Sequence, residues 1–368
     1  MLRPDTQKYK LLEMIGISGE FPSEQLPRLF DTPAYTEKMI TELKADNLIK
    51  LHYKDRLRGY RLKKQAKELL LYHNPLRFRC CLTGNSETNA VRSEPQRRLR
   101  LHQKAQTYVT LSHAGIPFFA DDKPPLFREG FPKECLSLQN IPCFYSSREV
   151  KELGEETTKI RNSRSIGILM APHCIYCIYN TGASLMKWEY QAEVRLSAFL
   201  QHYLKISLYH AQPDIRAIVF GNDMEMALQL LTSTGGKKRG LFMLDTSFQN
   251  FYFLPSDTKG ELLLKLLANP KLTARLNHLL LSDLDVCQDN IPLEHDAITQ
   301  DGVPTLLAYD FDMQKINRFN TGLNVFGLSG NLICFDFQIP VLERYMNSSV
   351  RFSSIDLAKF RKEFLHEP

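Results

Sequence analysis

The sequence has little that would suit a membrane-spanning or a secreted protein. No apolar run approaches the roughly 20 residues that a helix needs to cross a bilayer, and the opening MLRPDTQKYK lacks the apolar core of a secretion signal. The 8 cysteines are scattered through apolar stretches without the spacing of a disulfide framework, which is typical of buried free thiols in a reducing compartment. We therefore expect a cytoplasmic protein without a membrane partner.

Motifs for common cofactors are also missing. The chain has no glycine-rich phosphate loop and no dinucleotide-binding glycine motif, and residues 234–238 indicate a basic surface loop instead. Its 10 histidines are dispersed, so they do not form the paired cluster of a rolling-circle relaxase. Cys174 and Cys177 have the spacing of a metal pair, but side chains three positions apart on a strand face opposite sides of a sheet. No cofactor follows from motifs alone.

Positive charge is concentrated at one end of the chain. Lysine and arginine total 47 against 41 aspartate and glutamate residues, a net charge of +6. Residues 1–104 hold 21 of these basic residues and 12 of the acidic ones, a balance of +9, and the remainder carries −3. Because a basic surface attracts phosphates and releases their counterions, this asymmetry predicts a polyanion partner for the N-terminal part.

Residues 1–73 have the pattern of three helices followed by a β-hairpin. Apolar residues recur at helical spacing over residues 6–17, a second short helix opens at Pro22, and a third is expected over residues 32–47. Thr32 is expected to cap this third helix with its hydroxyl. The hairpin LIKLHYKDRLRGYRL follows, with alternating apolar residues and a turn over residues 55–59, and KKQAKELLLY closes the domain. This order predicts a winged helix-turn-helix.

Exposed polar side chains of this unit are the predicted DNA contacts. Tyr35 and Lys38 face outward on the third helix and would reach base edges in the major groove. Arg56 and Arg58, on the hairpin turn, would reach the backbone or the minor groove. The alternative is a protein-interaction module with solvated charges. The full set of predicted DNA-binding residues is Tyr35, Lys38, Lys44, Lys54, Arg56, Arg58, Arg97, Arg98 and Arg100.

Residues 74–142 are expected to be a basic helical connector that ends in a proline-rich linker. Arg97, Arg98 and Arg100 lie on its helical part and would extend the DNA footprint along the phosphate backbone. A solvated helix face that covers the junction between two domains explains the same residues equally well. Four prolines between residues 116 and 142 indicate the linker.

Residues 143–368 predict a larger α/β domain with a mixed sheet, so the fold class is α/β, or α+β overall. A hairpin is expected over residues 165–180 and a long helix over residues 181–204. Beyond them, short β-rich runs, with GLFMLD among them, alternate with helical runs. Three of the expected strands end in an aspartate, and a helix N-cap or turn residue is the favoured role for an aspartate at that position. The alternative is a divalent metal site, with Mg²⁺, that activates water for phosphodiester cleavage. Its candidate catalytic residues are Asp245, Asp310, Asp312 and Asp336.

The N-terminal part resembles the winged-helix domains of bacterial regulators, above all in YRLKKQAKELL, where Lys63 replaces a common threonine. The layout as a whole is similar to that of the replication-relaxation proteins of plasmids and conjugative elements, whose second domain is thought to be nuclease-like. Such a nuclease would carry an acid at one strand end and Glu-x-Lys on the next strand. Here Glu149-Val150-Lys151 falls on an expected helix before the hairpin, so the order differs.

This resemblance implies a DNA-binding protein of a bacterial mobile element that acts in plasmid replication, conjugation or its regulation. Double-stranded DNA would be its partner, and the α/β domain would serve assembly or regulation through a homo-oligomer or other mobile-element proteins. Two alternatives remain open. One is a metal-dependent relaxase or nuclease-like enzyme that nicks DNA, and the other is a transcriptional regulator that responds to a ligand or a protein.

Overall fold

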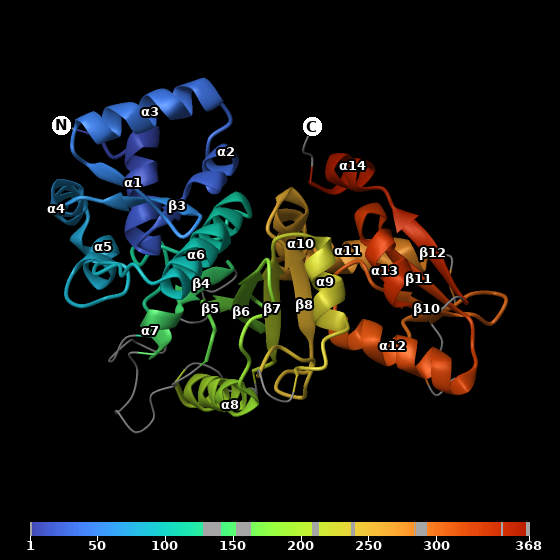
Figure 1. The fold of residues 1–368 in the computed structure, drawn as a ribbon. Helices are drawn as coiled ribbons and strands as arrows, with labels where there is room; N and C mark the ends of the chain where they lie inside the picture. Colours follow the sequence, from blue (N-terminus) through green and yellow to red (C-terminus); the bar gives the residue numbers. More distant parts are fainter. Residues whose placement is uncertain are drawn as a thin grey trace. The chain divides into compact units, whose positions relative to one another are not determined.

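The computed structural model describes residues 2–127, 141–151, 163–207, 213–236, 240–282, 284, 293–346 and 349–365. Contacts divide the chain into two compact units, Met1–Leu126 (unit 1) and Phe127–Pro368 (unit 2). Figure 1 shows that both contain helices and strands. The predicted α/β class, with an N-terminal winged helix before a larger mixed-sheet part, is confirmed.

Unit 1 has the element order of a winged helix. Three short strands form one antiparallel sheet in the order β1-β3-β2, and the β2–β3 hairpin is the wing. The elements up to the end of the wing are α1 (Gln7–Ser18), β1 (Phe21–Pro22), the 3-10 turn η1 (Ser23–Gln25), α2 (Leu26–Leu29), α3 (Pro33–Ala45), β2 (Ile49–Lys54) and β3 (Leu57–Leu62).

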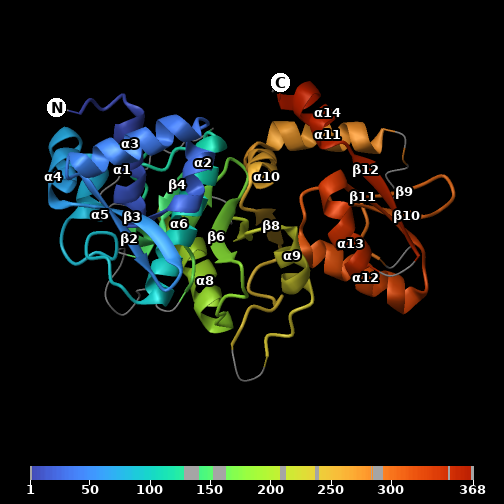
Figure 2. The ribbon, with the colours of Figure 1, turned by 45° about the horizontal axis from the view of Figure 1, so that its top comes forward.

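Three further helices complete unit 1: α4 (Lys64–His73), α5 (Pro75–Leu82) and α6 (Pro95–His113). Helix α1 lies between them, since it packs against α4, α5, α6 and β3 (Figure 2). Asn74 caps α5 by accepting a hydrogen bond from the Arg77 backbone N–H, and Pro75 occupies the first helical turn. Helices α5 and α6 therefore belong to the compact N-terminal unit, whereas the sequence placed them in a separate connector over residues 74–142.

Unit 2 begins with a five-stranded sheet in the order β4-β5-β6-β7-β8. The first three strands are antiparallel, and β6, β7 and β8 are parallel, so the predicted hairpin over residues 165–180 is confirmed. Figure 1 shows helices on this sheet. The elements are β4 (Cys143–Ser146), α7 (Ser147–Lys151), β5 (Gly167–Met170), β6 (Ile175–Gly182), α8 (Tyr190–Ser207), β7 (Ile215–Gly221), α9 (Met224–Leu231), β8 (Phe251–Pro255) and α10 (Thr258–Ala268).

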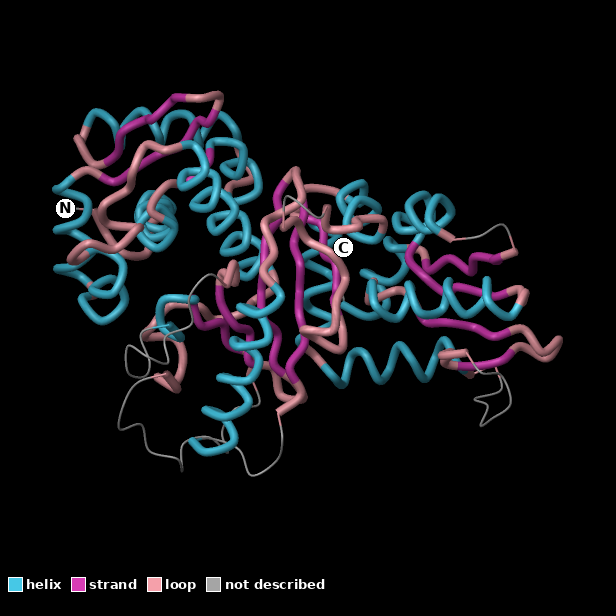
Figure 3. Tube along the Cα trace, turned by 60° about the horizontal axis from the view of Figure 1, so that its bottom comes forward, coloured by secondary structure: helices cyan, strands magenta, loops and turns pink. Residues whose placement is uncertain are grey.

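A second sheet of four strands follows in unit 2, in the order β12-β11-β10-β9 (Figure 3). Strands β10, β11 and β12 are parallel, and helices connect them. The Phe253 backbone N–H of strand β8 donates to the carbonyl of Phe311, which lies in the segment between β10 and α12. The elements are α11 (Pro270–Leu281), β9 (Ala297–Ile298), β10 (Pro304–Leu307), α12 (Met313–Phe326), β11 (Gly330–Phe335), η3 (Asp336–Gln338), α13 (Ile339–Tyr345), β12 (Val350–Ile355), α14 (Leu357–Phe360) and the π-helical turn η4 (Arg361–Leu365).

Two sequence predictions for unit 2 are wrong. The run GLFMLD, expected to be a strand, is a loop in which only Leu241 forms an isolated bridge, with Lys187. The Trp188 N–H also donates to the Gly240 carbonyl, and this pairing keeps the segment before Tyr190 extended. Helix α8 therefore starts at Tyr190 and not at residue 181 as expected. Within the described ranges, no helix is both long and apolar enough to cross a membrane.

Candidate nucleic-acid interface

Helix α3 presents a polar surface away from the core of unit 1. Met39, Ile40 and Leu43 are buried on its inner face, whereas Tyr35 is 46% exposed and Lys38 is exposed. This is the predicted division of the helix into a packed stripe and a free face. The Lys44 ammonium lies 5.6 Å from the centroid of the Tyr60 ring, next to the wing.

The start of α3 differs from the prediction in one detail. Thr32 is the N-cap residue, but its hydroxyl makes no capping hydrogen bond. Instead, the Thr36 hydroxyl donates to the Thr32 carbonyl at 2.9 Å. Pro33 follows in the first turn, where its missing N–H costs nothing and its fixed φ favours the helix.

The wing is a tight hairpin with a two-residue turn. Lys54 pairs with Leu57, so the turn consists of Asp55 and Arg56 alone, both with positive φ, of 54° and 61°. Such angles are those of a type I′ turn, whose twist matches the two strands. The sequence placed the turn over residues 55–59. Arg58 instead lies within β3, opposite Tyr53, and only Arg56 is at the tip.

One face of the wing lies outside the core. Leu51 and Tyr53 were expected to point inward with Ile49, yet they are 38% and 68% exposed and only Ile49 is buried. The strand was predicted correctly, but its burial does not alternate along β2 beyond Ile49. Exposed basic side chains are placed on both strands and on the turn: Lys50, Lys54, Arg56 and Arg58.

The opposite face of the wing packs on a buried carboxylate, Glu20. Its side chain has no exposed surface and binds three basic groups. Arg98 Nη2 lies 2.6 Å from Glu20 Oε1, Arg61 Nε lies 2.8 Å from Oε2, and His102 Nε2 lies 2.9 Å from Oε1. Burial would raise the pKa of Glu20, but the hydrogen bonds from His102, Arg98 and Arg61 outweigh it and lower the pKa to about 2.

Arg98 fixes the wing and does not face solvent, which corrects its predicted role as a DNA contact. The side chain is completely buried. Besides Glu20, its guanidinium donates to the carbonyl of Lys54 at 2.7 Å, to that of Leu57 at 2.9 Å and to that of His52 at 3.2 Å. The hydrogen bonds thus connect helix α6 to both strands of the hairpin. These bonds occupy the guanidinium N–H donors of Arg98 that would otherwise bind a phosphate.

Gly59 allows this close packing. The residue lies in β3 opposite His52, and a Cβ added there would come within 2.6 Å of Glu20 Oε1 and 2.9 Å of His102 Nε2. Its role is therefore steric, and it does not form the turn that the sequence indicated.

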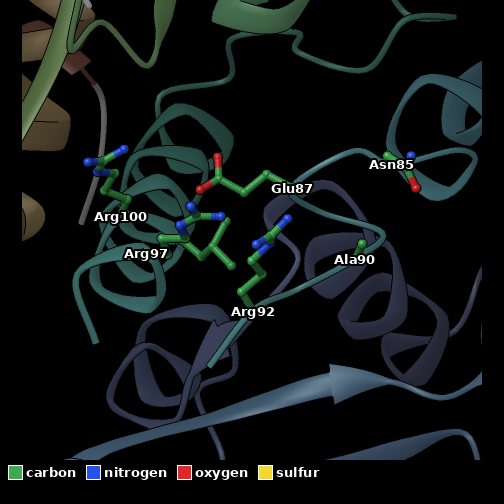
Figure 4. A pocket seen from close by; sticks show the side chains of 7 residues that line it. Asn85, Glu87, Ala90, Arg92, Arg97 and Arg100 are labelled. Carbon is green, nitrogen blue, oxygen red and sulfur yellow. The ribbon is translucent and has the colours of Figure 1, made fainter. Parts of the chain in front are cut away.

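The exposed arginines of α6 line a surface pocket of about 520 Å³. Arg97 and Arg100 belong to the first turns of α6, and Arg92 comes from the preceding loop. Figure 4 shows that the side chains of Arg92, Arg97 and Glu87 point toward the same space, with Arg100 farther along the helix. We call this the arginine pocket. Ala90 and Leu101 also line it.

Hydrogen bonds hold the loop wall of the arginine pocket. The hydroxyls of Ser86 and Thr88 both donate to the Cys81 carbonyl, at 2.8 and 2.7 Å. The Lys67 ammonium donates to the carbonyl and the side-chain oxygen of Asn89, both at 2.7 Å. These contacts tie the loop to α4 and α5.

Three of the four candidate catalytic acids of unit 2 accept hydrogen bonds that stabilise local structure. Asp312 caps α12 by accepting from the Gln314 N–H at 3.1 Å, as the capping interpretation predicted, and also accepts from Asn250 at 2.6 Å. Asp245 accepts from the Trp188 indole N–H at 2.6 Å. Asp336 begins the turn η3 and accepts from the backbone N–H of the residue that follows it.

Asp310 is the least satisfied of these acids. Burial, and then the nearby Asp312 charge, raise its pKa to about 7. The neighbouring ammonium of Lys315 binds Asp296 at 2.7 Å instead. Among the residues whose placement is described, no group of three or more histidine, cysteine, aspartate or glutamate side chains could hold a metal ion. The predicted metal cluster is therefore not found there.

Comparison of the chain with protein-family models, curated proteins and solved structures finds no match. The predicted set of DNA-binding residues contained neither Glu20 nor Arg92, two residues on which the geometry of unit 1 depends. Glu20 carried a usable signal, because a lone acid in the apolar segment 14–22 needs a buried partner if the segment is packed.

Proposed function

We propose that unit 1 binds double-stranded DNA, with α3 in the major groove and the wing on the adjacent backbone. The observation that carries this proposal is the rigid wing: Arg98 holds both strands of a hairpin whose basic side chains are exposed. A positioned basic hairpin beside a helix with a free polar face has the form of a winged-helix DNA reader.

The distribution of charge supports the same partner. Residues 1–126 contain 22 basic and 14 acidic residues, a balance of +8, while residues 127–368 carry −2. On the wing, Asp55 is the acid that accompanies Lys50, Lys54, Arg56 and Arg58. Contacts to phosphates dominate the affinity of such surfaces and make it dependent on salt.

We further propose a cytoplasmic protein of a bacterial mobile element, acting in plasmid replication, conjugation or its regulation, with unit 2 serving assembly or regulation. The resemblance of the layout to replication-relaxation proteins supports this part. A nuclease activity is not proposed, because Asp245, Asp312 and Asp336 each accept a hydrogen bond from a group of the protein itself.

Removal of Lys38 from the free face of α3 tests the major-groove assignment. Lys38→Ala in the full chain should weaken binding to a selected duplex by about 1–3 kcal/mol and relax its sequence preference, because a base contact is lost. Selection from a random duplex library, followed by fluorescence anisotropy, measures both quantities. Arg79→Ala removes an exposed charge from α5 and is the matched control. Equal affinity and preference for Lys38→Ala and Arg79→Ala would contradict the assignment.

A further inference from the structure

We propose that the arginine pocket binds a phosphate group, and that this group belongs to the DNA backbone beside the segment read by α3 and the wing. The assignment of this phosphate group to DNA rests on the proposed function. The shared chemistry, a phosphate held by arginine side chains, does not depend on it, since a free phosphorylated ligand would offer the same group.

The charges of the pocket suit a phosphate. Arg92, Arg97 and Arg100 line it together with one carboxylate, Glu87. Guanidinium groups present planar pairs of N–H donors that match phosphate oxygens, and such charge-assisted hydrogen bonds are the stronger ones in proteins. In Figure 4 Arg92 and Arg97 approach the same space from two different segments, as a clamp on one anion requires.

Arg97 is available for an incoming anion. Its nearest ion-pair partner is Glu94, at a long 3.8 Å, and the two side chains are 47% and 56% exposed. An exposed pair of this kind contributes little stability, so a phosphate of the DNA backbone would replace it at small cost. A volume of about 520 Å³ accommodates a phosphate with an attached sugar.

Both walls of the pocket are fixed to the same buried carboxylate. Arg61, bound to Glu20, donates through Nη2 to the Arg92 carbonyl at 3.2 Å, which holds the loop wall. Arg98, also bound to Glu20, immobilises the first turns of α6 next to Arg97. Because the same groups hold the wing, Glu20 is a positioning residue for wing and pocket together. A preformed site loses little conformational entropy when its ligand binds.

Glu87 distinguishes a phosphate site from a purely structural cluster, because the two predict different changes in phosphate affinity when its charge is removed. In Figure 4 its carboxylate lies on the side of the pocket toward which Arg92 and Arg97 point, so its negative charge opposes an incoming anion. Neutralising it should therefore strengthen phosphate binding, whereas removing the arginines should weaken it. If Glu87 only balanced the arginine charges to stabilise the loop, its neutralisation would not increase the affinity for phosphate.

The first arm of the test uses pyrophosphate as the probe in isothermal titration of the full chain. Arg92→Ala with Arg97→Ala should weaken binding by about tenfold or more, and Glu87→Gln should tighten it several-fold. Arg79→Ala, an exposed arginine of α5 that does not line the pocket, should leave binding unchanged. Equal affinity in wild type and the double variant, with unchanged circular dichroism, would overturn the proposal.

The second arm uses duplex DNA and identifies the source of the phosphate. If the backbone supplies it, the double variant should lower the slope of log affinity against log salt by about 1 to 2, and pyrophosphate should compete with DNA. If the double variant loses pyrophosphate binding but keeps the wild-type salt slope, the pocket is a phosphate site whose ligand is not the DNA backbone. Absence of DNA binding in wild type would reject the proposed function, and the pyrophosphate arm would still decide the pocket.

Discussion

Arg61 of β3 and Arg98 and His102 of α6 bind one buried carboxylate, Glu20, at distances of 2.6 to 2.9 Å. Three basic partners around one acid make the cluster sensitive to the loss of that single charge. A buried cation left without its partner is far more costly than the pair is stabilising.

Glu20→Gln should destabilise unit 1 by about 3–5 kcal/mol, because the completely buried Arg98 would lose its counter-charge. Hydrogen exchange of the α1 amides measures this loss. The only tryptophan, Trp188, lies in unit 2, so its fluorescence transition in urea is an internal control that should not move. Unchanged α1 protection would show that the cluster contributes little.

The same carboxylate predicts a dependence on pH. The pKa of Glu20 falls from 4.5 to about 2 in the folded protein, so its stabilising effect is complete above about pH 4.5 and is lost as the pH falls toward 2. The difference in unfolding free energy between wild type and Glu20→Gln should therefore shrink between about pH 6 and pH 3. A difference that stays constant with pH would show that the ionised Glu20 carboxylate does not provide this stabilisation.

Asp310 should show the opposite dependence. Its folded pKa, raised from 3.8 to about 7, means that stability falls as the pH rises from about 4 to 7 and the buried group ionises. Asp310→Asn should remove this loss and stabilise unit 2 by on the order of 1–3 kcal/mol at pH 8 relative to its effect at pH 4. Urea unfolding monitored by Trp188 fluorescence measures it. Asp336→Asn, in a turn, is the matched control, and equal effects would contradict the assignment.

At the scale of elements, the wing depends on the forked guanidinium of Arg98. Arg98→Lys keeps the charge but cannot bind Glu20 and the carbonyls of Lys54 and Leu57 together. Amides of β2 and β3 should then exchange about tenfold faster or more. Arg97→Lys changes the neighbouring, exposed residue and should leave them protected. Faster exchange in both variants, or in neither, would contradict the account.

The elements that the sequence predicted well are those with local signals. The core face of α3, the strands of the wing and the hairpin of β5 and β6 follow from periodicity within a few residues. The turn was misplaced, because Gly59 suggested a turn whereas its small size serves packing against Glu20. Arg98 was assigned to DNA, because nothing near it in sequence reveals a partner 78 positions away.

Strand β1 and the pocket were beyond local signals as well. Two residues, Phe21 and Pro22, are too short a strand to show alternation, and their pairing with Tyr60 and Gly59 is a contact of the folded unit. The three arginines of α6 were all predicted to contact DNA, but they lie on different faces of the helix. Arg98 is buried in unit 1, whereas Arg97 and Arg100 line the arginine pocket. Helical spacing alone does not say which face a neighbouring element covers.

At the scale of the whole molecule, charge and chemistry are divided between two units. The +8 balance of residues 1–126 accompanies the wing, the free face of α3 and the arginine pocket, whereas residues 127–368 carry −2. In unit 2, Asp312 caps α12, and Asp245 and Asp336 accept hydrogen bonds from groups of the protein. DNA binding is therefore expected to depend on unit 1 alone.

The salt dependence of duplex binding tests this central claim most directly. Each contact between a basic side chain and a phosphate adds about 0.9 to the slope of log affinity against log salt. Arg56→Ala with Arg58→Ala should weaken binding by the full chain and lower the slope by about 2, because both side chains are exposed on the wing. Arg79→Ala should change neither. Wild-type affinity and slope in the wing variant would contradict the account.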